Sequence, residues 1–249
     1  MSFFERLRAA ARSRRSQVCV GLDPDPQRIP GGARGALEHC LDVVRRTSDG
    51  VCCYKPNAAF WEQYGAAGLE AVAELRAAIP ADVPVIYDAK RADIDSTMRA
   101  YARAVFETLG MDAVTLHAYH GLDSLEAFTD PYPDRGMYVV CRTSNPGAAD
   151  LQDRLLDGEP LSWRVAELSA RANGHGNVGL VAGASEPARI AELRERSRLP
   201  FLVPGVGAQG GDLAAAVGAA WDGDEASCVV NASRSVLYAD DPGAAAESL

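Results

Sequence analysis

The two lysines of this sequence are the first candidates for chemistry. Of 25 basic residues only two, Lys55 and Lys90, are lysine, and all the others are arginine. Arginine stays protonated at any physiological pH, whereas an ammonium group can release a proton and presents a compact charge. Because arginine supplies nearly every other cation, these two positions indicate chemistry that arginine cannot perform. The alternative is that two surviving lysines are accidental.

The segment DAKRADIDST, residues 88–97, surrounds one lysine with acidic groups. Asp88 and Lys90 are two residues apart at the end of an expected strand, so side-chain alternation turns both toward the same side. Asp93 is expected to begin a helix, with Thr97 one turn later on the same face. The segment therefore offers two carboxylates around one ammonium, with a hydroxyl beyond. The alternative is an ion-pair cluster that only stabilises the structure.

A second group of candidates lies near the end of the chain, in GVGAQGGD (205–212) and NASRS (231–235). Glycines let the backbone approach an anion closely, Gln209 can donate to it, and Arg234 can bind a phosphate through two parallel hydrogen bonds. The alternative is an ordinary glycine-rich loop beside a solvated arginine. The pattern predicts a substrate that carries one phosphate.

The elements that must position these residues alternate regularly. Short runs rich in Val, Ile, Leu and Cys are separated by helix-length segments, as in β/α units around a parallel sheet. The runs are 17–22, 51–55, 83–89, 112–118, 137–142, 177–183, 200–205 and 226–232. Eight strands favour an α/β fold of the (β/α)₈ TIM-barrel type, as a single domain over 1–249, rather than an open doubly wound sheet. TIM-barrel active sites form at the carboxyl ends of the strands, where the candidate residues lie.

Three further segments carry expectations. Residues 1–16 are expected to form a leading helix with a buried stripe of Phe3, Phe4, Leu7 and Ala10, although an arginine-rich start also resembles a transit peptide. The polar segment 143–160 is expected to be an extended loop, which in such folds often binds or covers a ligand. The final ten residues are either a closing helix or a frayed end.

Composition narrows the classes of partner. A formal charge of −9 argues against nucleic acid, because an acidic surface repels polyanions. No apolar stretch approaches the roughly 18 residues that cross a membrane, so a cytoplasmic location is expected. No CxxC pair or zinc spacing occurs, and the cysteines are expected to be buried reduced thiols. They are Cys19, Cys40, Cys52, Cys53, Cys141 and Cys228.

Taken together, these motifs resemble the orotidine 5′-phosphate decarboxylase family. The likeness covers GLDPDP (21–26), YKPNAAFWEQYG (54–65), DAKRADIDST (88–97), RTSNPGA (142–148), PGVGAQGGD (204–212) and SRSVLYA (233–239). The stretch FWEQYG and the long segment 143–160 are most similar to a bacterial and archaeal branch. The resemblance implies a TIM barrel that works without a cofactor or metal. It also implies decarboxylation of orotidine 5′-phosphate to uridine 5′-phosphate, the last step of de novo UMP biosynthesis.

The resemblance implies a role for each charged residue. Lys90 would stabilise a carbanion at C6 of the pyrimidine and protonate it, with Asp88, Asp93 and Lys55 completing the network. Asp93 and Thr97 would reach into the site of a neighbouring subunit, which implies a homodimer with two shared sites. The substrate-binding residues would be Asp23 and Lys55 at the ribose hydroxyls, Ser144 at the pyrimidine edge, and Gln209, the Ser233 backbone N–H and Arg234 at the phosphate.

The sequence departs from some relatives at two positions. Ser233 and Ala92 stand where glycine is found in related chains. A backbone donor survives the change at Ser233, so only the local turn is in question there. Ala92 is a minor departure if its backbone is an ordinary helix start.

Two rival functions share part of the pattern. A related barrel acting on sugar phosphates resembles this chain in D-x-K-x-x-D but uses Mg²⁺ to hold an enediolate. Lys55, Ser144 and the lack of an extra carboxylate near the second strand argue against it, and His117 and His120 are more often wall residues than metal ligands. A catalytically silent barrel would only bind a nucleotide or phosphosugar, and it would keep Gln209 and Arg234 but lose a charged residue of the network. All four charged residues of the network are present in this sequence, namely Lys55, Asp88, Lys90 and Asp93.

Overall fold

Eight parallel strands form the centre of the molecule in a computed structural model that describes residues 1–205 and 213–249. Their order in the sheet is β2-β1-β10-β9-β8-β5-β4-β3, and parallel bridges from Tyr54 to Val85 and from Asn57 to Asp88 join β2 to β3. The predicted (β/α)₈ barrel is confirmed, with one strand in each expected run. The strands are β1 (Val18–Gly21), β2 (Cys53–Lys55), β3 (Ile86–Arg91), β4 (Ala113–Leu116), β5 (Gly136–Arg142), β8 (Val178–Ala182), β9 (Phe201–Pro204) and β10 (Cys228–Ala232).

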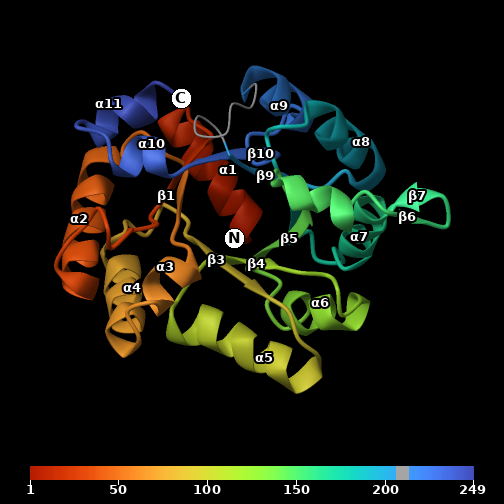
Figure 1. The fold of residues 1–249 in the computed structure, drawn as a ribbon, viewed down its shortest axis with the longest axis horizontal. Helices are drawn as coiled ribbons and strands as arrows, with labels where there is room; N and C mark the ends of the chain where they lie inside the picture. The colour runs from red at the N-terminus through yellow and green to blue at the C-terminus, as the bar shows by residue number, and fades with distance from the viewer. Residues whose placement is uncertain (206–212) are drawn as a thin grey trace.

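Helices surround the barrel (Figure 1) because each buries one apolar face against the strands. In α2, for example, Leu37, Cys40 and Val44 recur at helical spacing and are buried. The outer helices are α2 (Gly32–Thr47), α3 (Ala58–Glu62), α4 (Ala66–Ala78), α5 (Asp95–Arg103) with a π-helical continuation η1 (Ala104–Thr108), α6 (Leu122–Thr129), α7 (Leu161–Arg171), α8 (Pro187–Ser197), α9 (Leu213–Ala220), α10 (Arg234–Leu237) and α11 (Pro242–Glu247). The last of these lies within the final ten residues, so the expected closing helix is present there.

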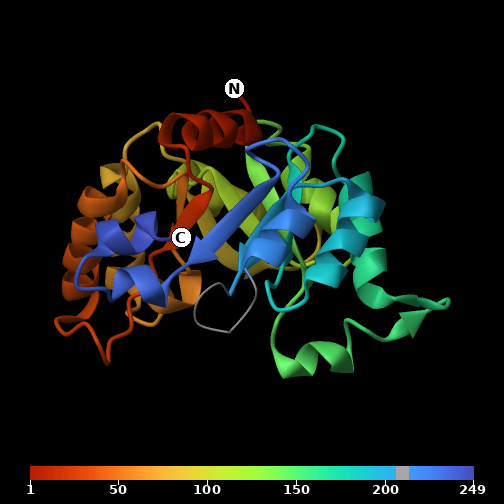
Figure 2. The ribbon, with the colours of Figure 1, turned by 90° about the horizontal axis from the view of Figure 1, so that it is seen from above.

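Helix α1 (Phe3–Arg14) lies across the amino-terminal end of the barrel (Figure 2). It begins with a capping box in which Ser2 and Glu5 satisfy each other's backbone N–H groups. Phe3 and Phe4 pack edge-to-face against Tyr138 of β5, with ring centroids 6.0 and 5.7 Å apart. A Cβ at Gly136 would lie 2.3 Å from the Phe3 ring, so glycine makes room for it. This end of the barrel is therefore filled, and the carboxyl ends of the strands are left for a site.

The segment 143–160 projects from the opposite end of the barrel (Figure 2) and is more regular than the expected extended loop. It contains a 3₁₀ helix η2 (Pro146–Asp150) and a hairpin of β6 (Leu155–Leu156) and β7 (Glu159–Pro160). Asp157 and Gly158 turn the hairpin with φ angles of 55° and 87°. A two-residue Asp-Gly turn with positive φ angles matches the twist of paired strands, which explains why this polar segment folds back on itself.

Two remaining expectations concern the cysteines and membrane-spanning helices. All six cysteines are buried free thiols, as predicted. Burial raises the pKa of Cys141 and of Cys228 to about 12, so these thiols are poor nucleophiles. Within 1–205 and 213–249, no helix has the length and apolar character needed to cross a membrane.

Candidate active site

A cavity of about 560 Å³ opens at the carboxyl ends of β1, β2, β3, β9 and β10. It collects half of the ten residues that the sequence singled out, from segments more than 200 residues apart. The described lining residues are Asp23, Asp25, Arg28, Lys55, Asn57, Phe60, Asp88, Pro204, Gly205, Asn231, Ser233, Arg234, Ser235 and Tyr238. Its lining carries both signs of charge, which suits a small charged ligand.

Asp88 lies between the two lysines. Its Oδ2 is 2.8 Å from Lys55 Nζ, and its Oδ1 is 2.6 Å from Lys90 Nζ. Lys55 is buried, whereas 43% of the Lys90 side chain is exposed. The arrangement therefore fixes Lys90 from one side, and Lys90 itself is not among the described residues that line the cavity.

The backbone of β3 is irregular at Lys90. The residue has a φ of 47°, in the left-handed region that non-glycine residues avoid, and the β3–β4 register shifts between Tyr87 and Arg91. Thr115 of β4 stabilises the irregularity: its hydroxyl accepts a hydrogen bond from Lys90 N at 2.9 Å and donates one to Asp88 Oδ1 at 2.8 Å. Simple strand alternation is thus not what brings Asp88 and Lys90 together. Backbone strain of this kind costs about 1–3 kcal/mol and is common at functional sites.

The charges of the buried pair reinforce each other. Burial by itself would raise the pKa of Asp88, but Lys55 and Lys90 outweigh it and hold that pKa well below its usual range. Burial would likewise lower the pKa of Lys55, but Asp23 and Asp88 outweigh it and raise that pKa. Asp88 is therefore a carboxylate and Lys55 an ammonium at neutral pH.

Asp93 and Thr97 lie apart from this pair. Helix α5 begins at Asp95 with Ile94 as its N-cap, so the prediction that Asp93 begins the helix is wrong. The Asp93 carboxylate instead accepts a hydrogen bond from the next backbone nitrogen, Ile94 N, at 2.8 Å. The Asp93 carbonyl accepts a hydrogen bond from the Ser124 hydroxyl. Among the ion pairs of the described chain, none joins Asp93 to Lys90 of the same chain. Thr97 is half-buried in the first turn of α5.

Asp23 is held on both carboxylate oxygens at one wall of the cavity. Oδ1 accepts from Asn57 N at 3.2 Å, and Oδ2 accepts from the Ser233 hydroxyl at 2.8 Å. Asn231 in turn donates to Ser233 Oγ at 3.2 Å, and its own buried Oδ1 has no partner among the described residues. This free acceptor suits a hydroxyl donor on a ligand. The sequence pointed to the strand end but not to these side-chain roles of Asn231 and Ser233.

One end of the cavity carries two arginines, Arg28 and Arg234. Arg234 is exposed at the first position of α10, with Ser233 as the N-cap. Arg28, which the sequence reasoning missed, is a second cation on the lining, and its guanidinium lies 3.7 Å from the centroid of the Tyr238 ring. Gln209 lies outside the described residues.

Ser144 follows β5 and lies against the end of β8. A Cβ at Gly183 would come within 2.8 Å of the Ser144 Cβ and 2.9 Å of its backbone nitrogen, so the glycine permits this approach. Ser144 is not among the described residues that line the cavity.

The two histidines after β4, His117 and His120, differ in their exposure. His117 is half-buried, and burial together with the nearby Lys90 ammonium lowers its pKa, while His120 is exposed. Across residues 1–205 and 213–249, no three His, Cys, Asp or Glu side chains gather closely enough to hold a metal ion.

Comparison with known proteins identifies the family of this chain. The model of the orotidine 5′-phosphate decarboxylase / HUMPS family matches residues 16–249. A Roseiflexus castenholzii protein named orotidine 5′-phosphate decarboxylase is 52% identical over 247 residues, covering 96% of this chain and 90% of the relative. The one from Thermomicrobium roseum is 50% identical over 256 residues, covering 100% of this chain and 91% of the relative.

A solved structure extends the likeness to three dimensions. The OMP decarboxylase of Leishmania donovani superimposes with a TM-score of 0.92 at 42% sequence identity, covering 100% of this chain and 95% of that one. Sequence and fold thus agree over essentially the whole described chain. The chain belongs to the orotidine 5′-phosphate decarboxylase / HUMPS family.

Proposed function

We propose that this protein decarboxylates orotidine 5′-phosphate to uridine 5′-phosphate, the last step of de novo UMP biosynthesis, without a cofactor. Family membership supports the substrate, because full-length relatives at about 50% identity carry that name. The observation that carries the chemistry is the contact of Lys90 Nζ with Asp88 Oδ1 at 2.6 Å, because Asp88 and Arg234 line the same cavity. An ammonium fixed in this way can meet negative charge that develops on a bound ligand.

In the proposed mechanism, Lys90 acts on the carbon that loses its carboxylate. The bond from C6 to the carboxyl carbon breaks, CO₂ leaves, and the electron pair stays on C6. The Lys90 ammonium stabilises that pair and then transfers a proton from Nζ to C6, which leaves a neutral amine that regains a proton from solvent. A fixed positive charge is effective here because it needs no reorganisation as negative charge develops.

Lys90 cannot supply the whole rate enhancement. Two unit charges at about 4 Å gain roughly 4 kcal/mol at an effective dielectric near 20. Very proficient enzymes lower their barriers by up to about 23 kcal/mol. Asp88 and Lys55 would contribute by preorganising the ammonium, and binding energy from the remote phosphate would orient the reacting ring.

The proposed binding roles are those that the family resemblance implies. Asp23 and Lys55 would bind the ribose hydroxyls, and Arg234, the Ser233 backbone N–H and Gln209 would bind the phosphate. Ser144 would bind the edge of the pyrimidine. The Oδ1 of Asn231, which has no partner among residues 1–205 and 213–249, supports a hydroxyl-bearing ligand at this wall.

A homodimer with shared sites is part of the proposal. Asp93 makes no ion pair with Lys90 within the described part of its own chain, so it is available to the site of a second subunit together with Thr97. Two large apolar side chains that follow the neighbouring strands β3 and β4 are exposed, Ile94 at 58% and Tyr119 at 84%. An apolar surface beside an incomplete charged network suits a subunit interface.

The deciding experiment follows the ultraviolet absorbance of orotidine 5′-phosphate with the purified protein, once with a chelator and once with added Mg²⁺. We expect loss of the substrate absorbance at the same rate in both. Absence of turnover in both would contradict the proposed function, and turnover only with Mg²⁺ would favour the metal-dependent relatives of the barrel family.

A further inference from the structure

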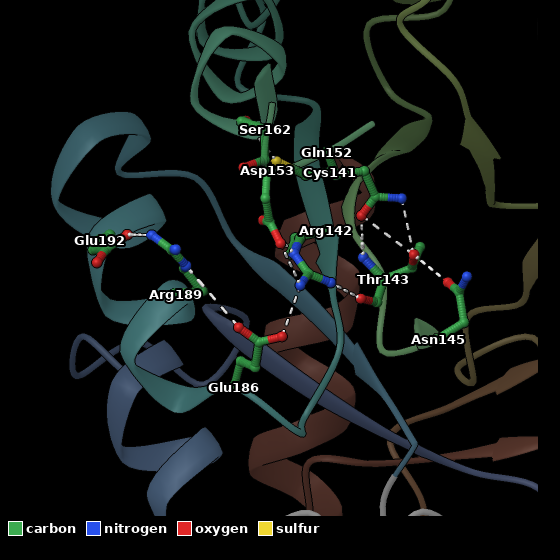
Figure 3. A network of polar contacts seen from close by, with 10 residues as sticks. All are labelled: Cys141, Arg142, Thr143, Asn145, Gln152, Asp153, Ser162, Glu186, Arg189 and Glu192. Carbon is green, nitrogen blue, oxygen red and sulfur yellow. Dashed lines mark hydrogen bonds and ion pairs between the residues drawn. The ribbon is translucent and has the colours of Figure 1, made fainter. Parts of the chain in front are cut away.

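The segment 143–160 is attached to the barrel by a polar network centred on Arg142, the last residue of β5 (Figure 3). The Arg142 guanidinium is buried and binds Asp153 through two parallel hydrogen bonds of 3.0 Å each. It also donates to Glu186, the N-cap of α8, at 2.7 Å. One side chain therefore joins the projecting segment to the loop between β8 and α8.

The same network fixes the peptide that precedes Ser144. Arg142 Nη1 donates to the carbonyl oxygen of Thr143, and Gln152 Oε1 accepts from Thr143 N at 2.8 Å. Gln152 Nε2 also donates to Thr143 Oγ1 at 2.9 Å. Thr143 is therefore held at its amide, its hydroxyl and its carbonyl, by partners on both sides of it in the sequence (Figure 3).

A third constraint acts on Ser144 from the strand next to β5. Gly183 N donates to Arg142 O at 2.9 Å, and the absence of a side chain at Gly183 lets the Ser144 backbone approach closely. Ser144 thus has its preceding peptide clamped and its own backbone packed on a glycine. A residue held in this way keeps one position before any ligand arrives, which reduces the ordering cost of binding.

We propose that Arg142 and Gln152 are positioning residues that hold Ser144 ready to recognise the pyrimidine base. The inference rests on the proposed function, because it takes Ser144 as the contact to the base. Neither side chain is assigned to touch substrate. Their effect is confined to the base, since the described residues proposed for the ribose and phosphate lie at or just after the carboxyl ends of β1, β2 and β10.

The test compares ligands with and without the base. Affinities for uridine 5′-phosphate and for ribose 5-phosphate are measured by calorimetry in wild type, Gln152→Ala, Gln152→Glu and Arg142→Lys. We expect Gln152→Ala and Arg142→Lys to weaken uridine 5′-phosphate about tenfold and to leave ribose 5-phosphate unchanged, a loss typical of one misplaced hydrogen bond. Gln152→Glu keeps an acceptor for Thr143 N and should lose less than Gln152→Ala.

Arg189→Ala is the matched control. Arg189 pairs with Glu192 at 2.9 Å and lies 4.0 Å from Glu186, and among the described residues it makes no hydrogen bond or ion pair with 143–160 (Figure 3). Its affinity for both ligands should match wild type. Equal weakening of both ligands in Gln152→Ala, or of neither, would overturn the inference, because a merely structural role would not discriminate between them.

Hydrogen exchange separates this inference from the proposed function. The Thr143 amide donates to Gln152, so its exchange should be slow in wild type and faster in Gln152→Ala. If wild type does not turn over orotidine 5′-phosphate, the proposed function fails, and this measurement still decides whether Gln152 holds the peptide. Unchanged exchange at Thr143 would refute the positioning role even in an active enzyme.

Discussion

The ammonium nitrogen of Lys90 lies 2.6 Å from Oδ1 of Asp88, although the Lys90 backbone has a φ of 47°. The same carboxylate oxygen accepts a hydrogen bond from Thr115, and the other oxygen binds Lys55. Asp88 is therefore saturated by protein groups, whereas Lys90 is still partly exposed. Of the two, Lys90 is the group that remains able to meet a ligand.

Lys90→Ala should remove turnover while sparing ligand binding. The ammonium is proposed to stabilise charge that appears only in the transition state, so its loss should lower kcat at least about 10³-fold, the equivalent of roughly 4 kcal/mol. Stopped assays on orotidine 5′-phosphate would measure kcat, and calorimetry would measure binding of uridine 5′-phosphate. Lys90→Arg keeps the charge but cannot release a proton, so it should also be severely impaired. Turnover equal to wild type in either variant would remove Lys90 from the mechanism.

The buried pair should keep its charges over a wide pH range. The lowered pKa of Asp88 means that its stabilising effect is present above the unfolded value of about 3.9 and is lost as the pH falls through the folded value. The raised pKa of Lys55 means that its effect is present below about 10.4 and is lost as the pH rises through the folded value.

The measurement is the free energy of unfolding of wild type and Asp88→Asn as a function of pH. We expect the variant to be less stable by about 3 kcal/mol, because one partner of a buried pair is removed. That difference should stay constant from roughly pH 5 to 9 and shrink below about pH 4. The exposed Glu70→Gln should show no comparable difference. A difference that changes near neutral pH would contradict the assigned charges.

Gly21 should be required because the Ser233 side chain occupies the space beside it. A Cβ at Gly21 would lie 1.8 Å from Ser233 Oγ and 2.7 Å from its Cβ. Gly21→Ala should therefore destabilise the protein by about 1–3 kcal/mol, as overpacking does. Adding Ser233→Gly removes the clash, so the double variant should unfold near the temperature of Ser233→Gly alone. If the double variant is as unstable as Gly21→Ala, the close contact is not the cause.

Asp112 should matter for stability and not for catalysis. Its buried carboxylate lies at the amino-terminal end of β4 and binds Arg6 of α1 at 2.7 Å, Arg76 of α4 at 3.1 Å and Val85 N at 2.9 Å. Asp112→Asn would leave these cations without their partner, so we expect a loss of about 3 kcal/mol in chemical denaturation. kcat/KM at a temperature where the variant is folded should equal that of wild type. A selective loss of kcat/KM would mean that this end of the barrel affects the site.

Much of the architecture could be predicted because the signals are local. Apolar runs of strand length separated by amphipathic segments indicate eight β/α units, and the fold then assigns the polar residues to one end of the barrel. Asp23, Lys55, Asp88, Ser233 and Arg234 do line one cavity. The roles of individual residues stay predictions, because they came from family resemblance.

Side-chain contacts between segments far apart in the chain could not be predicted from the sequence. The bulge that reorients Lys90 depends on Thr115 of the next strand, and the Ser233 side chain bonds Asp23 across 210 residues. Arg142 appeared only as the end of a strand, yet it anchors residues 143–160 through Asp153.

The predicted start of α5 was wrong for a local reason. The Asp93 carboxylate binds the next backbone N–H, and the helix begins two residues later, at Asp95.

Subunit mixing should reveal whether Asp93 serves a neighbouring site. Lys90→Ala and Asp93→Asn chains should each be nearly inactive alone. A hybrid dimer would contain one site with Lys90 from one chain and Asp93 from the other, so co-expression or co-refolding of the two variants should restore partial decarboxylase activity. The control combines Lys90→Ala with Lys55→Ala.

That control should stay inactive, because Lys55 and Lys90 bind the same Asp88 within one chain and no hybrid site can contain both lysines. If Asp93 instead acted in its own chain, mixing Asp93→Asn with Lys90→Ala would restore no activity. The proposal of shared sites would then be wrong. Activity that is restored in the first mixture and absent from the second therefore requires that one subunit supplies the Asp93 carboxylate. The other subunit supplies the Lys90 ammonium, which Asp88 of that same subunit binds.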